Sequence, residues 1–323
     1  MKNRVKRALL LLLALTLMPV LAACGDGEQR GQQDSNRLTV ICSIYPVYDF
    51  TRQIAHGHAD VYQMLPKGMD SHDYEPSVGD MVAASRADLF IYTDDEMETW
   101  IGGIKGSLGE EKLFRCAGGI DLEALNEEWE RIEHENEGED EEEHHHEHKY
   151  DAHIWLDPTL AVIMCENIRD RLIALDPANS DDYTSACLAL TDEIMALDAD
   201  FEALFQAHPQ AVLCFGGSFS YSHFIRRYGV KYLSAYDGCG ENEEVNLGRL
   251  IGITRLMQDT GAKYVFTDEL SDGLIAGEIS RKTGARILLF HSCHTVSGSD
   301  AAGSYTDLMR RNYDNVRRAL GEG

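Results

Sequence analysis

The chain has 323 residues, enough for two domains of ordinary size, and its composition is that of a globular protein. Its formal net charge is -26 at pH 7. A surface this negative argues against nucleic acid as a partner and favours cations, but it says nothing about the fold.

The N-terminal segment has the pattern of an export signal. Four basic residues precede an uninterrupted apolar run, Ala8 to Met18, which is too short to span a membrane. The run ends in Leu21-Ala-Ala-Cys24, and small residues before a cysteine resemble a bacterial lipobox. We therefore predict a lipoprotein signal peptide over 1–23, a lipidated Cys24, and a flexible polar tether over 24–36. An ordinary signal peptide with an incidental cysteine is the alternative. Loss of the four basic residues would take the net charge from -26 to about -30.

The next segment alternates short β-branched runs with helical patterns, which indicates parallel α/β units and predicts a first lobe over 37–175. Strands are predicted over Leu38–Ile44, Val61–Leu65, Ala87–Tyr92 and Lys112–Cys116, and helices over Val47–His56, Val78–Ser85 and Met97–Gly103. Ser77 is predicted to cap the second of these helices.

A tract of acids and histidines follows, and it is too charged to join a core. We interpret 133–149 as a solvated loop of the first lobe. Directly after it comes Asp151-Ala-His153-Ile-Trp-Leu-Asp157-Pro158, an apolar run with one histidine where the loop meets the fold. Neutral imidazoles and carboxylates together are ligands of a borderline metal such as zinc. The tract and its border therefore predict capture of a divalent metal.

A long helical pattern divides the chain. Apolar residues at helical spacing predict helices over Pro158–Leu175 and Ser180–Gln206. The second would span roughly 40 Å, which suits a rigid linking helix within 176–208. A second α/β lobe is predicted over 209–323. Its strands are predicted over Ala211–Phe215, Val230–Ala235, Tyr264–Thr267 and Arg286–Phe290, and its helices over Phe224–Tyr228, Asn246–Thr260, Gly273–Thr283 and Tyr305–Leu320.

Six short motifs occur in an order that resembles one known family. They are Ser43-Ile-Tyr-Pro46, His72-Asp-Tyr-Glu-Pro76, Asp151-Ala-His153-Ile-Trp-Leu-Asp-Pro158, Asp176-Pro-Ala-Asn179, Arg227-Tyr-Gly229 and Tyr305-Thr-Asp-Leu-Met-Arg310. Over about 38–320 the chain resembles the metal-binding lipoproteins of zinc and manganese ABC importers, the cluster A-I solute-binding proteins. The resemblance implies two α/β lobes joined by a long rigid helix, with metal in the cleft between the lobes.

The resemblance also implies metal ligands. In the first lobe they are His72 and His153, each in a loop where a strand end can aim it into a cleft. The second lobe departs from the family pattern, because Ser218 stands where a third histidine is expected and a serine hydroxyl is a poor zinc ligand. His291 falls where the family usually has an aspartate, and we predict it as the third ligand. The fourth ligand stays open among Glu243, Glu241, His223, His294 and water.

The cysteines divide into two groups. Cys239 and Cys293 lie in polar or Gly/Ser-rich loops that would flank the second-lobe half of the site, which motivates a disulfide between them. The others singled out lie in apolar or periodic segments and are predicted as small core residues: Cys42, Cys165, Cys187 and Cys214.

The function implied is capture of Zn²⁺ outside the cytoplasm and delivery to an ABC permease and its ATPase, by a monomer that the lipid holds to the bacterial cell membrane. Three imidazoles favour zinc over manganese, which prefers oxygen-rich sites. A manganese importer is the alternative. A metal-dependent hydrolase, with Glu75 or Asp151 as general base, and a surface adhesin are weaker alternatives. The chain is not expected to be an enzyme, because it lacks the His-Glu-x-x-His and phosphate-loop motifs.

Overall fold

The computed structural model describes residues 37–137, 151–236, 238, 245, 247–298 and 303–322. The chain divides into two units, Met1–Arg37 and Leu38–Gly323, and the account below concerns the second. The predicted signal peptide, Cys24 and the tether lie outside the described residues, as does the acid- and histidine-rich tract from 138 to 150. In the part of the chain that is described, no helix is both long enough and apolar enough to cross a membrane.

The first lobe is built on a parallel sheet with strand order β2-β1-β3-β4. All four residues of β3 are buried, as expected for a parallel strand whose two faces are both covered. The strands are β1 (Leu38–Cys42), β2 (Ala59–Gln63), β3 (Leu89–Tyr92) and β4 (Leu113–Arg115). The helices are α2 (Tyr45–Ala55), α3 (Val78–Arg86), α4 (Ile101–Lys105) and the short η1 (Glu110–Lys112). Ser77 caps α3 in a capping box with Asp80, as predicted.

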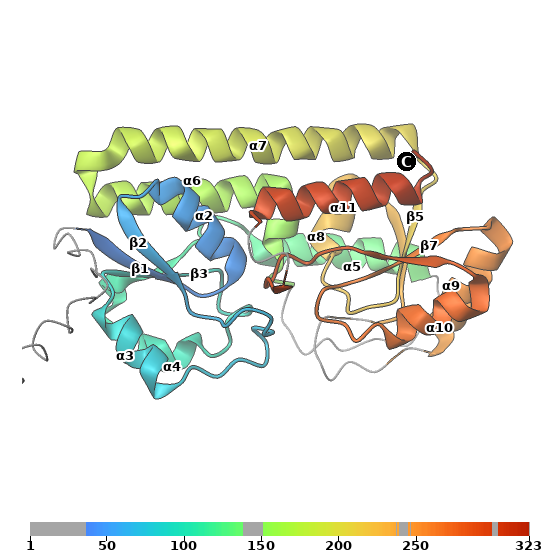
Figure 1. Cartoon of the computed structure of the whole chain (residues 1–323), viewed down its shortest axis with the longest axis horizontal. Coiled ribbons are helices and arrows are strands. Elements are labelled where there is room, and N and C mark those ends of the chain that lie inside the picture. The colour runs from blue at the N-terminus through green and yellow to red at the C-terminus, as the bar shows by residue number, and fades with distance from the viewer. Residues whose placement is uncertain are drawn as a thin grey trace, which may run out of the picture. The chain divides into compact units, whose positions relative to one another are not determined.

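The second lobe repeats this arrangement, with a parallel sheet in the order β6-β5-β7-β8 (Figure 1). Its strands are β5 (Val212–Phe215), β6 (Lys231–Ser234), β7 (Tyr264–Thr267) and β8 (Arg286–Leu289). Its helices are α8 (Ser222–Tyr228), α9 (Leu247–Thr260), α10 (Leu274–Thr283) and α11 (Tyr305–Ala319).

A single long helix, α7 (Ser180–Ala207), serves both lobes (Figure 1). Its 28 residues correspond to a length of about 42 Å. It packs against α2 and α6 (Pro158–Leu175) of the first lobe and against α8 and α11 of the second. The short η3 (Pro177–Asn179) turns the chain from α6 into α7, and the Tyr183 hydroxyl donates to Asp176 across this turn. The predicted fold class, two α/β lobes joined by a long helix, is confirmed.

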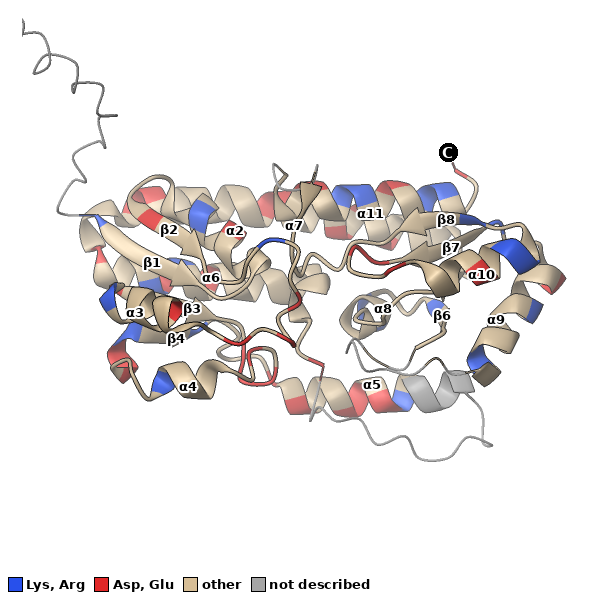
Figure 2. Cartoon of the chain, turned by 60° about the horizontal axis from the view of Figure 1, so that its bottom comes forward, with Lys and Arg blue, Asp and Glu red and all other residues tan. Residues whose placement is uncertain are grey.

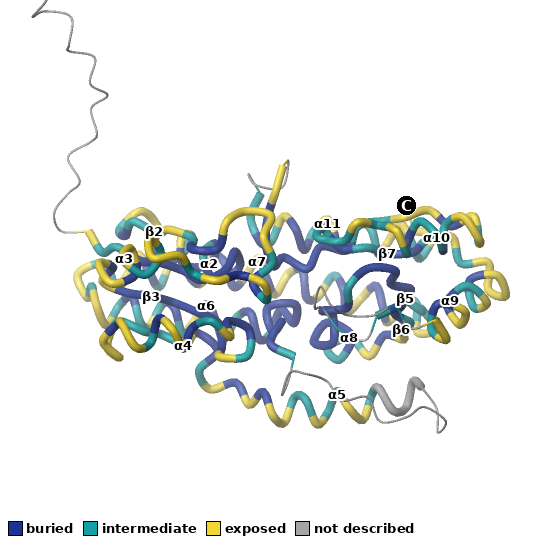
Figure 3. Tube along the Cα trace, turned by 90° about the horizontal axis from the view of Figure 1, so that it is seen from below, coloured by how far each residue is buried: buried dark blue, intermediate teal, exposed yellow. Residues whose placement is uncertain are grey.

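One helix was not predicted. The helix α5 (Leu122–Glu137) occupies a segment without an assigned element and extends into the tract interpreted as a loop from 133. Its Trp129 stacks on Phe219 and lies 5.4 Å, ring to ring, from Tyr232, both in the second lobe. Much of its remaining surface is acidic and exposed (Figures 2 and 3). Packing of one aromatic residue against the other lobe thus stabilises a helix whose sequence is mostly charged.

The four cysteines predicted as core residues are buried free thiols, as is Cys116. The disulfide that the sequence motivates between Cys239 and Cys293 is not tested by the described residues. Cys293 is a buried free thiol, and Cys239 lies outside the described residues.

Candidate metal centre

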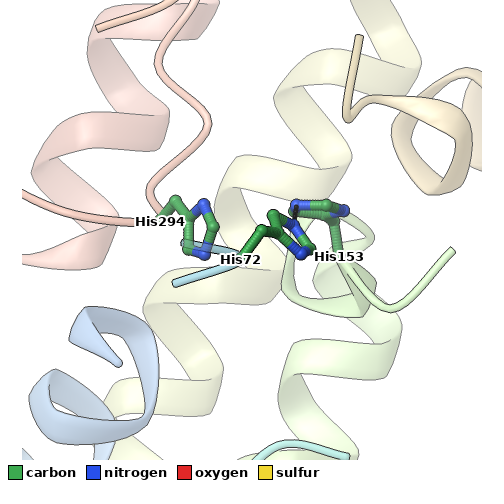
Figure 4. A group of neighbouring side chains, drawn as sticks. All are labelled: His72, His153 and His294. Atoms are coloured by element: carbon green, nitrogen blue, oxygen red, sulfur yellow. Dashed lines mark hydrogen bonds between the residues drawn. The ribbon is translucent and has the colours of Figure 1, made fainter. Parts of the chain in front are cut away.

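Three histidines from distant parts of the chain converge at one point between the lobes (Figure 4). His72, His153 and His294 each offer a ring nitrogen, and these three atoms lie within 4.8 Å of one another. The three ring centroids form a triangle with sides of 5.4 Å. Among the described residues, this is the one group of three or more potential metal ligands found so close together.

The fold explains why these side chains meet. His72 lies in the loop between β2 and α3, and His153 directly precedes the short helix η2 (Ile154–Leu156), which leads into α6. His294 lies in the connection between β8 and α11 of the second lobe. His72 and His294 both follow the carboxyl ends of parallel strands, where ligand-binding loops of open α/β sheets gather.

The spacing suits a tetrahedral metal. Zinc–imidazole bonds of about 2.0–2.1 Å at the tetrahedral angle place ligand nitrogens about 3.4 Å apart. The Nε2 atoms of His72 and His153 are 3.5 Å apart. One ring nitrogen of His294 lies within 4.8 Å of those of His72 and His153, so the three imidazoles could hold a zinc ion and leave one further position.

A carboxylate fixes the ring of His153. The Nδ1–H of His153 donates to Oδ1 of Asp151 at 2.6 Å, which leaves the lone pair of the neutral ring on Nε2, facing His72. Burial alone would raise the pKa of Asp151, but the adjacent His153 and bonds from His153 and Ser222 hold that pKa well below its usual range. A histidine backed by an ionised carboxylate is a more basic metal ligand with a fixed orientation.

His294, the ligand candidate of the second lobe, is kept neutral by burial and not by a bonded carboxylate. His294 is 3 % exposed, and burial, reinforced by the nearby rings of His153 and His72, lowers its pKa well below the ordinary value. The ring is therefore neutral, as metal binding requires. Its Nε2 contacts the hydroxyl of Ser71 in the first lobe, and its Nδ1 lies 3.8 Å from Asp70. Trp155 packs beside both His153 and His294.

The structure does not bring His291 into this group, which corrects its predicted placement. The Nδ1 of His291 lies 3.2 Å from Oε1 of Glu269 and 2.9 Å from the backbone nitrogen of Cys293, so the ring is turned into the second lobe. Cys293 adopts a left-handed conformation with φ of 58°. That turn directs the next residue, His294, toward the first lobe.

The other open candidates are placed as follows. His223 is buried with Nε2 on the backbone oxygen of Asp151, and it is not in the group. Glu241 and Glu243 lie outside the described residues. From the sequence, His294 is a candidate only for the fourth position. It lies three residues further into the loop after β8 than His291, but the sequence gives no means of ranking one above the other.

Two parallel-sheet lobes on one long helix, with imidazoles from both lobes meeting between them, define a metal-binding solute-binding protein. The family model described as zinc-uptake complex component A, periplasmic, matches residues 40–319, and the chain belongs to this family. The predicted resemblance to cluster A-I solute-binding proteins is therefore confirmed, with Zn²⁺ as the ligand that the family description indicates and manganese not favoured.

Individual relatives agree with this assignment. The chain is 29% identical to the high-affinity zinc uptake system protein ZnuA of Bacillus subtilis, over 93% of this chain and 94% of that protein. It is also 29% identical to the zinc-binding lipoprotein AdcA of Streptococcus pneumoniae over 95% of this chain, but spans only 60% of AdcA. The crystal structure of the Zn(II)-bound ZnuA-like domain of that AdcA shares the fold, with a TM-score of 0.70, 23% identity, and coverage of 88% of this chain and 98% of that domain.

Proposed function

We propose that the chain captures Zn²⁺ with His72, His153 and His294 and delivers it to an ABC permease and its ATPase. The observation that carries this proposal is that three imidazoles from the two lobes converge on one point. The Nε2 atoms of two of them are 3.5 Å apart, close to the separation of two ligand nitrogens on a tetrahedral zinc ion. Water, Glu241 or Glu243 would complete the tetrahedron. The names of the relatives, a zinc uptake protein and a zinc-binding lipoprotein, support zinc as the cargo.

The cellular setting is part of the same proposal. A family described as periplasmic supports a position outside the cytoplasm. The sequence Leu21-Ala-Ala-Cys24 and the lipoprotein name of one relative support a lipid anchor on Cys24. We further propose that the mature protein is a monomer, with lobes over 37–175 and 209–323 and a linking helix within 176–208.

The family is a transport component, and the site favours that role over hydrolysis. A metallohydrolase requires a general base beside an open coordination position. Glu75 is exposed, and both carboxylate oxygens of Asp151 are engaged by His153 and Ser222. The laminin-binding protein of Streptococcus agalactiae, which shares the fold, is described as both an adhesin and a metal transporter. The metal centre described above gives no support to an adhesin role for this chain.

Titration calorimetry with Zn²⁺ on the mature chain tests the proposal. His294→Ala is expected to weaken the single tight site at least 100-fold, because a neutral nitrogen ligand is lost. His291→Ala, three residues away in the same loop, is the matched control and is expected to retain tight binding. Replacing the tract histidines His144, His145, His146 and His148 by serine keeps the chain length and is expected to spare the tight site.

Two outcomes would contradict this assignment. Normal binding by His294→Ala together with loss in His291→Ala would return the second-lobe ligand to His291. Loss of tight binding in the tract variant alone would move the site to the tract.

A further inference from the structure

We propose that the first turn of α8, through Ser222 and His223, positions the metal ligand His153 by holding Asp151 from the second lobe. This inference rests on the proposed function, because it assigns how one ligand of that site is oriented. It makes Ser222 and His223 positioning residues, which touch no metal and act through Asp151.

Asp151 is the point where the two lobes meet behind the ligand. Its Oδ1 accepts both the backbone N–H of His153, at 2.9 Å, and the Nδ1–H of the same residue, at 2.6 Å. Its Oδ2 accepts the hydroxyl of Ser222, the first residue of α8. Its backbone oxygen lies 2.8 Å from Nε2 of His223. Two acceptors that Asp151 does not offer to His153, Oδ2 and the backbone oxygen, are thus held by α8.

The environment makes these bonds effective. His153, Ser222 and His223 are all buried, with at most 4 % of each residue exposed. The side chain of Asp151 itself is 23 % exposed, but its partners are shielded from water, which makes these hydrogen bonds more costly to break than fully exposed ones. Burial also lowers the pKa of His223, so its ring is neutral and donates its proton from Nε2 to Asp151.

A further contact fixes α8 against the first lobe. Arg226, one turn after Ser222, donates to Asp157 at 2.5 Å and to Glu128 of α5 at 3.2 Å. Asp157 itself caps α6, the helix that begins directly after the His153 motif. The start of α8 is therefore held in register with the segment that carries His153.

These contacts give the second lobe two ways to contribute to the metal site. Ser218, where the family pattern expects a histidine, offers no such ligand. The same lobe instead reaches the metal by two routes, directly through His294 and indirectly through Ser222 and Asp151. Metal on Nε2 of His153 makes Nδ1–H a stronger donor, which strengthens its bond to Asp151 and hence the tie to α8.

A double-mutant cycle on the mature chain, titrated with Zn²⁺, tests this route. Asp151→Asn is expected to weaken zinc binding by about 10–100-fold and Ser222→Ala by about 5–10-fold. The double variant is expected to bind no more weakly than Asp151→Asn alone, because the serine acts through the aspartate. Ser234→Ala removes another buried serine of the second lobe, on β6, and is expected to bind like the wild type.

A second readout separates positioning from general stability. Ser222→Thr and Ser222→Val have nearly equal side-chain volumes, but only the first keeps the hydroxyl donor. With Co²⁺ as the probe, Ser222→Thr is expected to reproduce the visible absorption spectrum of the wild type. Ser222→Val is expected to shift the band positions and lower the zinc affinity, although circular dichroism shows both variants folded.

The results distinguish failure of this inference from failure of the proposed function. If the wild type binds Zn²⁺ tightly but Ser222→Val and Ser222→Thr have equal affinities and spectra, the positioning role is overturned and the zinc site stands. The role is also overturned if the effects of Asp151→Asn and Ser222→Ala multiply as independent losses. If the wild type lacks a tight zinc site, the proposed function itself fails.

Discussion

At the carboxyl edge of the sheet in each lobe lies a glutamate with a buried side chain, Glu98 in the first lobe and Glu269 in the second. In the first lobe Glu98 accepts from Ser43 Oγ and from the backbone N–H groups of Thr93 and Asp94, at the ends of β1 and β3. In the second lobe Glu269 accepts both the backbone N–H and the hydroxyl of Ser292, in the loop that carries His294. Both glutamates join chain segments at the carboxyl edge of a sheet.

Their pKa values nevertheless move in opposite directions. Burial raises the pKa of Glu98 to about 7, because its hydrogen-bond donors are all neutral and offset burial only in part. Burial acts on Glu269 as well, but the ring of His291 at 3.2 Å and the two bonds from Ser292 outweigh it and lower the pKa. Similar hydrogen bonding therefore gives a carboxyl that titrates near neutrality in one lobe and a permanent carboxylate in the other.

The largest effect is expected from removing Glu269. Glu269→Ala leaves the N–H and hydroxyl of Ser292 without their acceptor, which should lower the free energy of unfolding by about 3 kcal/mol. Zinc affinity should fall with it, since the loop holding His294 loses its anchor. Urea denaturation of the metal-free protein measures the first effect and calorimetry the second. Glu278→Ala, which removes a partly exposed glutamate of α10 paired with Arg281 and Lys282, is the control, and equal denaturation midpoints for the two variants would refute the anchoring role.

An intermediate effect is expected at the bond that ties this loop to the first lobe. The indole N–H of Trp155 donates to the backbone oxygen of Ser292 at 2.8 Å. Trp155→Phe keeps an aromatic ring but removes the donor, and it should lower the free energy of unfolding by about 1–2 kcal/mol. Thermal unfolding without metal is the measurement. Unchanged stability would contradict a role for this bond in holding the loop.

The smallest effect concerns pH and Glu98. Because the folded-state pKa, about 7, lies above the ordinary glutamate value of 4.5, the folded protein binds a proton that the unfolded chain has released. This contribution to stability is complete below the unfolded value and is lost as pH rises through about 7. Between pH 8 and pH 6 the free energy of unfolding should therefore increase by about 1 kcal/mol from this group.

The Glu98→Gln variant isolates that contribution, since it cannot titrate at this position. Denaturant unfolding at several pH values should show a smaller gain from pH 8 to pH 6 in the variant than in the wild type. Parallel pH dependences for the two proteins would show that Glu98 titrates outside this range. Glu269 should add no such gain in the free energy of unfolding between pH 8 and pH 6, because its pKa is lowered.

Local sequence was sufficient to predict the bounds of helices and strands where capping residues or short apolar runs determine them. Helix α6 begins at Pro158 and ends at Leu175 as predicted, because Asp157 caps it and Pro177 follows it. Strand β7, Tyr264–Thr267, also has the predicted bounds. His72 and His153 were predicted as ligands from motifs that resemble those of the family, and the structure brings their Nε2 atoms to 3.5 Å from each other.

The features decided by tertiary structure depend on contacts between residues far apart in the sequence. Helix α5 is mostly charged, and its Trp129 packs on Phe219 of the other lobe, ninety residues away. His294, rather than His291, lies beside His72 and His153 because of the left-handed turn at Cys293 and the bonds that Asn312 and Glu269 make to this loop. Periodicity and capping reveal which residues form an element, because they act within a few residues. The direction in which a loop histidine points is set by hydrogen bonds across the fold, and only the folded chain brings those partners together.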